Sequence, residues 1–173
     1  AGGVEAADVG RLIRIFLQRQ VESCRDVRLL EELRPHRARA GGLHRQLVVG
    51  DAAHHVEIEI RGDQTLHHLH KAIFKTFERY DEHLYAFFMG NKPWDAASEY
   101  SVPHPESNAR NAKRARIDSL DLKLKKKFLY LFDFGDEWWH SVQLLGIRQE
   151  EPKGKYPRVI ESQGKSPPQY DEE

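Results

Sequence analysis

Apolar and polar residues alternate strictly in the segment from residue 55 to residue 61. Val56, Ile58 and Ile60 are apolar, and the residues between them are charged. Successive side chains of a β-strand point to opposite faces of a sheet, so this period of two predicts a strand with one buried face. Gly62 and Asp63 then predict a turn.

The pattern changes to helical spacing over residues 65–79. The apolar positions that share one stripe of such a helix are Leu66, Leu69, Ile73 and Phe77. A stripe of this kind is typical of a helix that packs one face against a core. Thr65 or Asp63 can cap its first turn, because a short oxygen-bearing side chain accepts the free amide protons there.

Aromatic residues return at residues 83–90, which predicts a further strand that ends at Gly90. Residues 91–116 contain three prolines and few apolar residues. We therefore expect a long surface excursion, with residues 99–103 as the place for a short strand. Residues 117–124 are expected to form a capped turn that sets two leucines on the core.

Residues 126–147 contain two apolar runs around the sequence DFGDE, which predicts a β-hairpin. In the first run one face is expected to carry Phe128, Tyr130, Phe132 and Phe134, opposite Leu129, Leu131 and Asp133. In the second run one face carries Trp138, His140, Val142 and Leu144, opposite Trp139, Ser141, Gln143 and Leu145. Strands that are apolar on both faces lie centrally in a sheet. Strands joined around one main helix predict a single α+β domain.

The first 50 residues differ in composition from the rest of the chain. They contain nine arginines, no lysine and a single aromatic residue, Phe16. The apolar positions near helical spacing are Leu12, Ile15, Phe16 and Val21. This spacing favours an additional N-terminal helix within residues 9–24, although the alternation of residues 12–17 also fits a strand.

Pro35 and the pair Gly41-Gly42 break any regular pattern further along, so we expect a linker or flexible segment there. The chain is thus expected to divide into a divergent N-terminal extension, residues 1–50, which is partly helical or flexible, and an α+β domain, residues 51–173.

The composition argues against several classes of protein. The 27 basic and 27 acidic residues balance, so no global field attracts nucleic acid or anionic lipid. Cys24 is the only cysteine, which excludes an internal disulfide and a multi-thiolate metal site. No apolar run approaches the roughly 18 residues that cross a bilayer. We expect a soluble cytoplasmic protein, without a cofactor or membrane association, that is a monomer or a weak homo-oligomer.

Three blocks of the sequence, residues 58–90, 129–147 and 154–170, resemble in order and spacing the Ri-plasmid "ORF-three"-like family. That family is also described as an insertion-sequence passenger protein family. The resemblance covers residues 54–170. It implies an α+β fold with a curved, mixed sheet over one helix and an association with plasmids and mobile elements. The resemblance implies no biochemical activity.

The chain departs from the family pattern in two places. Many relatives have a cysteine pair where this chain has Val159 and Ser166, so a metal or redox role for that pair is absent here. The family's N-terminal strand has no clear counterpart before residue 54.

The hairpin turn carries the most suggestive chemistry. The residues of a candidate cleft are His83, Tyr85, Asp133, Asp136, Trp138 and His140. Carboxylates beside an imidazole can hold a divalent metal or transfer protons, with Asp136 and His140 as the weak metal candidates. We favour a scaffold role instead, in which Asp136 accepts backbone amide protons of its own turn and His140 bonds to a neighbour.

Two further groups of residues are candidates for binding. His67 and His70 share a face of the expected helix, but no zincin motif follows, which favours ordinary surface histidines. The basic residues of a nucleic-acid candidate are Arg110, Lys113, Arg114, Arg116, Lys123, Lys125, Lys126 and Lys127. Such a run can follow a phosphate backbone or be a solvated loop.

These features predict a non-catalytic binding module of mobile-element origin that engages a protein or nucleic acid. The alternative is a metal-dependent hydrolase that uses an Asp/Asp/His cluster at the hairpin turn. A third interpretation is self-assembly through an exposed strand edge. The sequence ending in Pro167-Pro168 and Tyr170 is expected to dock on the protein itself.

Overall fold

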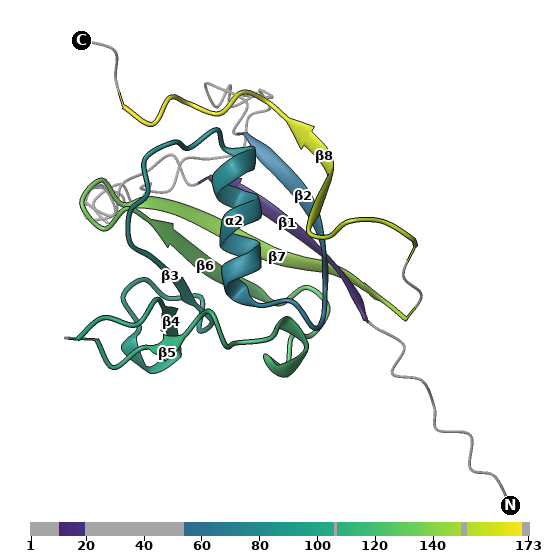
Figure 1. Cartoon of the computed structure of the whole chain (residues 1–173), viewed down its shortest axis with the longest axis horizontal. Coiled ribbons are helices and arrows are strands. Elements are labelled where there is room, and N and C mark those ends of the chain that lie inside the picture. Colours follow the sequence, from purple (N-terminus) through teal and green to yellow (C-terminus); the bar gives the residue numbers. More distant parts are fainter. Residues whose placement is uncertain (1–10, 20–53, 106, 150–151, 171–173) are drawn as a thin grey trace, which may run out of the picture.

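The computed structural model describes residues 11–19, 54–105, 107–149 and 152–170, which form one open sheet with a helix across one face (Figure 1). The strands are β1 (Leu12–Arg19), β2 (His55–Arg61), β3 (Tyr85–Phe88), β4 (Glu99–Ser101), β5 (Arg110–Asn111), β6 (Lys127–Phe132), β7 (Trp138–Arg148) and β8 (Arg158–Gln163). The helices are α2 (Leu66–Thr76) and the short 3-10 turns η1 (Ala96–Ser98) and η2 (Ile117–Ser119).

The strand order is β5-β4-β3-β6-β7-β1-β2-β8. Every neighbouring pair is antiparallel except β4 and β5, which run parallel, so the sheet is mixed. The predicted α+β class, with one main helix on a mixed sheet, is confirmed.

The helix predicted within residues 9–24 is wrong for residues 12–19, where the strand alternative is confirmed. The rest of that prediction and the predicted linker around Pro35 and Gly41-Gly42 lie outside the described residues. These residues form β1 between β2 and β7, where Ile15 lies opposite Ile58 on one side and Leu144 on the other. Two neighbouring strands satisfy the backbone of β1 along both edges, and this pairing outweighs the helical spacing of its apolar residues. The sheet therefore has a strand before residue 54, so the expectation that the family's N-terminal strand lacks a counterpart there is wrong.

The predicted hairpin is confirmed as β6 and β7, which pair from Lys127 opposite Gln143 to Phe132 opposite Trp138. Both strands lie in the interior of the sheet, as their apolar character on both faces predicted. The expected position of Phe134 is wrong. Asp133 has a positive φ of 57°, so the chain leaves the strand there and Phe134 packs on the opposite face from Phe132.

The core lies mainly between α2 and the sheet. The predicted stripe of α2 and its C-cap is buried, and it packs against the inward-facing residues of β1, β2, β6 and β7. Thr65 is the N-cap, and its backbone amide donates to the Nδ1 of His68, 3.1 Å away. A smaller cluster on the other face of the sheet consists of Ala86, Phe88, Leu129, Leu131 and Trp139.

The short strand expected within residues 99–103 is confirmed as β4, whereas β5 and β8 were not predicted. The C-terminal residues 166–170 dock on the chain itself, along the end of α2 (Figure 1). The Ser166 hydroxyl donates to the carbonyl of Phe77 at 2.9 Å, and the Gln169 side chain bonds to the backbone of Tyr80 and Asp81.

Candidate functional site

A groove of about 480 Å³ lies between α2 and the segment that enters β3. Residues from four parts of the chain line it, and they are His67, His70, Lys71, Glu82, His83, Leu84, Tyr85, Val102 and Lys113. His67, His70 and Lys71 project from the same side of α2 because residues three and four positions apart share a helix face. We call this feature the histidine groove.

Two hydrogen bonds between histidine and tyrosine organise the floor of the histidine groove. The Nδ1 of His67 is 2.7 Å from the hydroxyl of Tyr85, and the Nδ1 of His70 is 2.8 Å from the hydroxyl of Tyr130. The rings of His70 and Tyr85 stack face to face, with centroids 3.7 Å apart and planes only 7° apart. The floor is therefore a rigid set of rings, each fixed by a polar partner.

Burial keeps these histidines neutral. The pKa of His70 is lowered to about 3, mainly by burial and to a smaller extent by His67 and Lys71. The pKa of His67 is also lowered, first by burial and then by the charge of Lys113. Burial raises the pKa of the Tyr130 hydroxyl well above its ordinary value. The groove thus presents neutral hydrogen-bonding rings near pH 7.

Charged side chains stand at the rim of the histidine groove. The Nζ of Lys71 is 2.5 Å from a carboxylate oxygen of Glu82, so that lysine is paired across the groove. Lys113 enters from the turn after β5. Neutral rings inside, with Lys113 at the edge beside the Lys71–Glu82 ion pair, can hold a flat polar group that carries a negative charge beside it.

The structure brings only part of the predicted cleft together. His83 and Tyr85 both line the histidine groove. Asp133 adjoins them, because its Oδ2 lies 3.5 Å from the Nδ1 of His83. The same histidine is hydrogen-bonded through Nε2 to the hydroxyl of Tyr170, at 2.8 Å.

An aspartate side chain stabilises the hairpin turn by accepting backbone amide protons, as predicted, but this residue is Asp133 rather than Asp136. The Oδ1 of Asp133 accepts the backbone amides of Gly135 and Asp136, at 2.9 and 3.3 Å. The side chain thereby stabilises its own left-handed backbone conformation, as short acidic side chains do in turns. Asp136 itself is exposed to solvent.

His140 lies apart from the carboxylates of the turn. It is 1% exposed, its Nδ1 is 2.9 Å from the carbonyl oxygen of Trp138, and its Nε2 has no hydrogen-bond partner. Its ring packs edge-on against Phe77 under α2, with centroids 4.8 Å apart. Across the described ranges, no three side chains of the His, Cys, Asp and Glu types gather in a metal-binding group.

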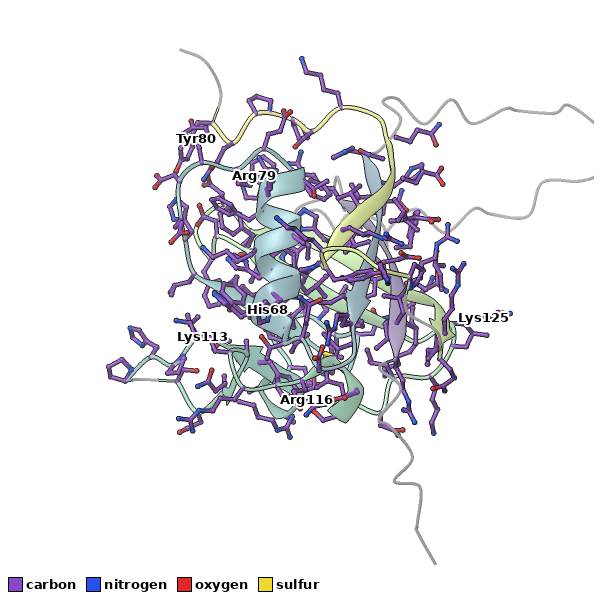
Figure 2. The ribbon with its side chains drawn as sticks, turned by 45° about the vertical axis from the view of Figure 1, so that its right-hand side comes forward. His68, Arg79, Tyr80, Lys113, Arg116 and Lys125 are labelled. Atoms are coloured by element: carbon purple, nitrogen blue, oxygen red, sulfur yellow. The ribbon has the colours of Figure 1, made fainter. Side chains whose placement is uncertain are left out.

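The eight basic residues of the nucleic-acid candidate do not form one surface. Lys113 and Arg116 lie near the N-terminal end of α2, whereas Lys125 lies at the opposite edge of the molecule (Figure 2). Arg116 is paired with Asp118 at 2.6 Å, and Arg110 lies over the ring of Tyr100. Of the set, Lys113 alone lines the histidine groove.

The prediction of ordinary surface histidines is wrong for His70, which is 4% exposed. The sequence analysis also missed Lys71, Glu82 and Tyr130 as parts of the site. The helical spacing of His67, His70 and Lys71 was visible in the sequence, and the alternation along β6 places Tyr130 on the face toward α2. What the sequence did not give is the path of residues 77–84, which brings Tyr85 beneath the helix.

Comparison with known proteins places the chain in a family. A family model described as plasmid pRiA4b ORF-3-like protein matches residues 52–170. The chain belongs to this family. The pRiA4b ORF-3-like region contains the whole histidine groove, whereas β1 precedes it.

Among solved structures, this pRiA4b ORF-3-like chain is similar to a protein of unknown function, MM3350, from Methanosarcina mazei Go1. The two are 19% identical, with a TM-score of 0.64, and the match covers 92% of this chain and 73% of the other. At this identity the similarity shows a shared fold. No curated protein matches the sequence. In the part of the chain that the structure describes, no helix is long and apolar enough to span a membrane.

Proposed function

We propose that this pRiA4b ORF-3-like protein is a non-catalytic binding module of mobile-element origin, and that it binds single-stranded nucleic acid in the histidine groove. The observation that carries the proposal is a neutral, ring-lined floor that has Lys113, and Lys71 in its ion pair with Glu82, at the rim. Single-stranded nucleic acid offers the matching chemistry, since each nucleotide joins a flat polar base to a phosphate.

The dimensions of the histidine groove support a ligand of one or two nucleotides at a time. Its volume of about 480 Å³ is within the range of pockets that hold small ligands. The rings of His67 and His83 are only partly buried and can pack against a base, and lysine can approach phosphate as a point charge. The balanced net charge favours such local recognition over long-range attraction to a duplex.

The arrangement of the groove supports binding rather than turnover. Its histidines are bonded to tyrosine hydroxyls, and the depressed pKa of His70 keeps its proton affinity far from neutrality. A general base or acid works best with a pKa near the operating pH. The carboxylates of the hairpin turn and His140 do not share one open site, so the hydrolase alternative is not proposed further.

The proposal predicts that Lys113→Gln weakens binding of a fluorescently labelled single-stranded oligonucleotide on the order of tenfold at low salt. Loss of one phosphate contact should also make the slope of log affinity against log salt less negative by about 0.7. Fluorescence anisotropy over a salt series measures both quantities.

Lys125→Gln is the matched control, because Lys125 belongs to the same basic run but lies at the other edge of the molecule (Figure 2). Its affinity should equal that of the parent protein. Absence of binding at low salt would remove the proposal. If Lys113→Gln and Lys125→Gln lowered the oligonucleotide affinity equally, the oligonucleotide would not bind specifically in the histidine groove.

A further inference from the structure

Two arginines converge on one tryptophan beyond the C-terminal end of α2. Arg19 ends β1, and Arg79 follows α2. Their guanidinium carbons lie 3.9 and 3.6 Å from the centre of the Trp138 ring. Figure 2 places Arg79 at the end of the helix away from His68, Lys113 and Arg116, so this feature is distinct from the rim that Lys113 forms.

Neither guanidinium has an acidic partner among the residues that the structure describes. The ion pairs among the described residues include neither Arg19 nor Arg79. Arg79 is only 7% exposed and donates one hydrogen bond, from Nη1 to the carbonyl of Pro167 at 3.2 Å. The Nε of Arg19 and the Nη2 of Arg79 are buried without any acceptor.

Two of the described histidines also have buried nitrogen atoms without a hydrogen-bond partner. These atoms are the Nε2 of His140 and the Nδ1 of His54. Burial lowers the pKa of His140 to about 3, and the charges of Arg79 and Arg19 contribute to that shift. Burial and the charge of Arg19 likewise lower the pKa of Arg79 to about 10. A buried cation is costly without a counter-charge, and none stands beside these arginines among the residues that the structure describes, which favours an anionic ligand here.

An open hollow adjoins Arg19 and the ring of Trp138, and Arg79 is hydrogen-bonded to Pro167 in its wall. Its volume is about 460 Å³, and it is lined by Arg19, Asp136, Trp138, Pro167, Pro168, Gln169 and Tyr170. Among the described lining residues Asp136 alone carries a carboxylate, and it is exposed to solvent, where water screens its charge. Residues 167–170 of the C-terminal segment line the same hollow.

We propose that Arg19 and Arg79 form an anion site that takes a phosphate group entering through this hollow. A phosphate offers several oxygens at once, so it can accept hydrogen bonds from two guanidinium groups. The ring of Trp138 holds both groups in place before the ligand arrives, which reduces the entropy lost on binding. The group can be free inorganic phosphate or the monoester phosphate of a nucleotide. This site is independent of the histidine groove.

Isothermal titration calorimetry of the full chain with inorganic phosphate, AMP and adenosine tests the inference. We expect phosphate to bind with a Kd of about 1 mM or lower, and Arg79→Lys to weaken it about tenfold because lysine lacks the planar fork. Binding of AMP as tightly as phosphate, or more tightly, identifies a monoester ligand. Binding of phosphate without AMP identifies the free ion. Both outcomes support the site, provided that adenosine does not bind.

Arg110→Lys is the matched control, since Arg110 also lies over an aromatic ring, that of Tyr100, at 5.2 Å. It should leave the phosphate affinity unchanged. If Arg79→Lys does not fold, Arg19→Lys gives the same comparison. The side-chain Nε–H resonance of Arg19 in a ¹⁵N-correlated NMR spectrum should also shift on addition of phosphate, and that of Arg110 should not.

Two results would overturn the inference. One is a chain that binds neither phosphate nor AMP, which would mean that the arginines only cover the Trp138 ring. The other is phosphate binding that Arg79→Lys and Arg19→Lys leave unaltered. Neither result bears on oligonucleotide binding through Lys113, so the two proposals can fail separately.

Discussion

Replacing Leu17 with alanine is expected to lower the free energy of unfolding by about 2–5 kcal/mol, the usual cost of removing a large side chain from a packed core. Leu17 is fully buried on the face of β1 toward α2, and it lies opposite Val56 on β2 and Val142 on β7. Urea unfolding followed by circular dichroism measures the loss.

Phe16→Ala is the control for this prediction, because the two interpretations of the N-terminal segment reverse the importance of the two residues. In the strand, Phe16 is half-buried on the opposite face, where its ring lies 5.3 Å from that of His55. Phe16→Ala should therefore cost less than Leu17→Ala. In the helix considered from the sequence, Phe16 belonged to the apolar stripe and Leu17 did not. A larger loss for Phe16→Ala would contradict the register of β1.

The protein is expected to lose on the order of 4 kcal/mol of stability between pH 7 and pH 5 through His70 and His140 together. Burial lowers the folded-state pKa of each to about 3, whereas an unfolded histidine keeps a value of 6.5. Both side chains are nearly inaccessible, at 4% and 1% exposed, so solvent does not screen them.

The direction follows from proton uptake. Below pH 6.5 the unfolded chain takes up a proton at each histidine that the folded chain does not bind, so acid favours unfolding. The stabilisation is fully present above pH 6.5 and is lost progressively as the pH falls toward 3. Each histidine contributes about 1.4 kcal/mol per pH unit within the steep part of this window.

His70→Gln isolates one of these contributions. The amide can still bond to the hydroxyl of Tyr130, but it does not titrate, so the slope of unfolding free energy against pH should fall by about 1.4 kcal/mol per pH unit. His68→Gln, on the exposed side of the same helix, should retain the slope of the parent. Urea unfolding at a series of pH values provides the measurement, and an unaltered slope in His70→Gln would show that His70 is protonated in the folded state.

Much of the fold follows from local patterns in the sequence. Val56, Ile58 and Ile60 alternate because only one face of β2 meets α2, and the stripe of α2 has the matching period of 3.6. The runs of β6 and β7 are apolar on both faces because a cluster packs on each side of the sheet. These features depend on local sequence patterns, so they can be predicted without knowing which strands pair.

The elements that escaped prediction depend on distant partners. The apolar residues of β1 fit both the helical spacing and the alternation of a strand. Pairing with β2 and β7, which are far away in the chain, decides in favour of the strand. β8 lies at the edge of the sheet with most of its side chains exposed, so little apolar patterning marks it. The same reason hid Arg19 and Arg79, which are 60 positions apart in the sequence and meet only through Trp138.

The candidate cleft illustrates the same limit. The family resemblance and strand parity placed His83 beside the hairpin turn, and in the structure it lies 3.5 Å from Asp133. Parity also placed His140 on the face toward α2, but the burial of that face removed it from any open site. A turn composed of acidic and aromatic residues resembles a metal or proton-transfer site in the sequence. In the structure Asp133 mainly stabilises the backbone of the hairpin.

Nuclear magnetic resonance mapping of a short single-stranded oligonucleotide onto the ¹⁵N-labelled full chain tests the binding proposal most directly. We expect the largest chemical-shift changes at His67, Lys71, Tyr85 and Lys113, with little change along β8, which lies at the far edge of the sheet. Changes confined to β8, or spread evenly over the basic residues of the surface, would contradict a ligand in the histidine groove.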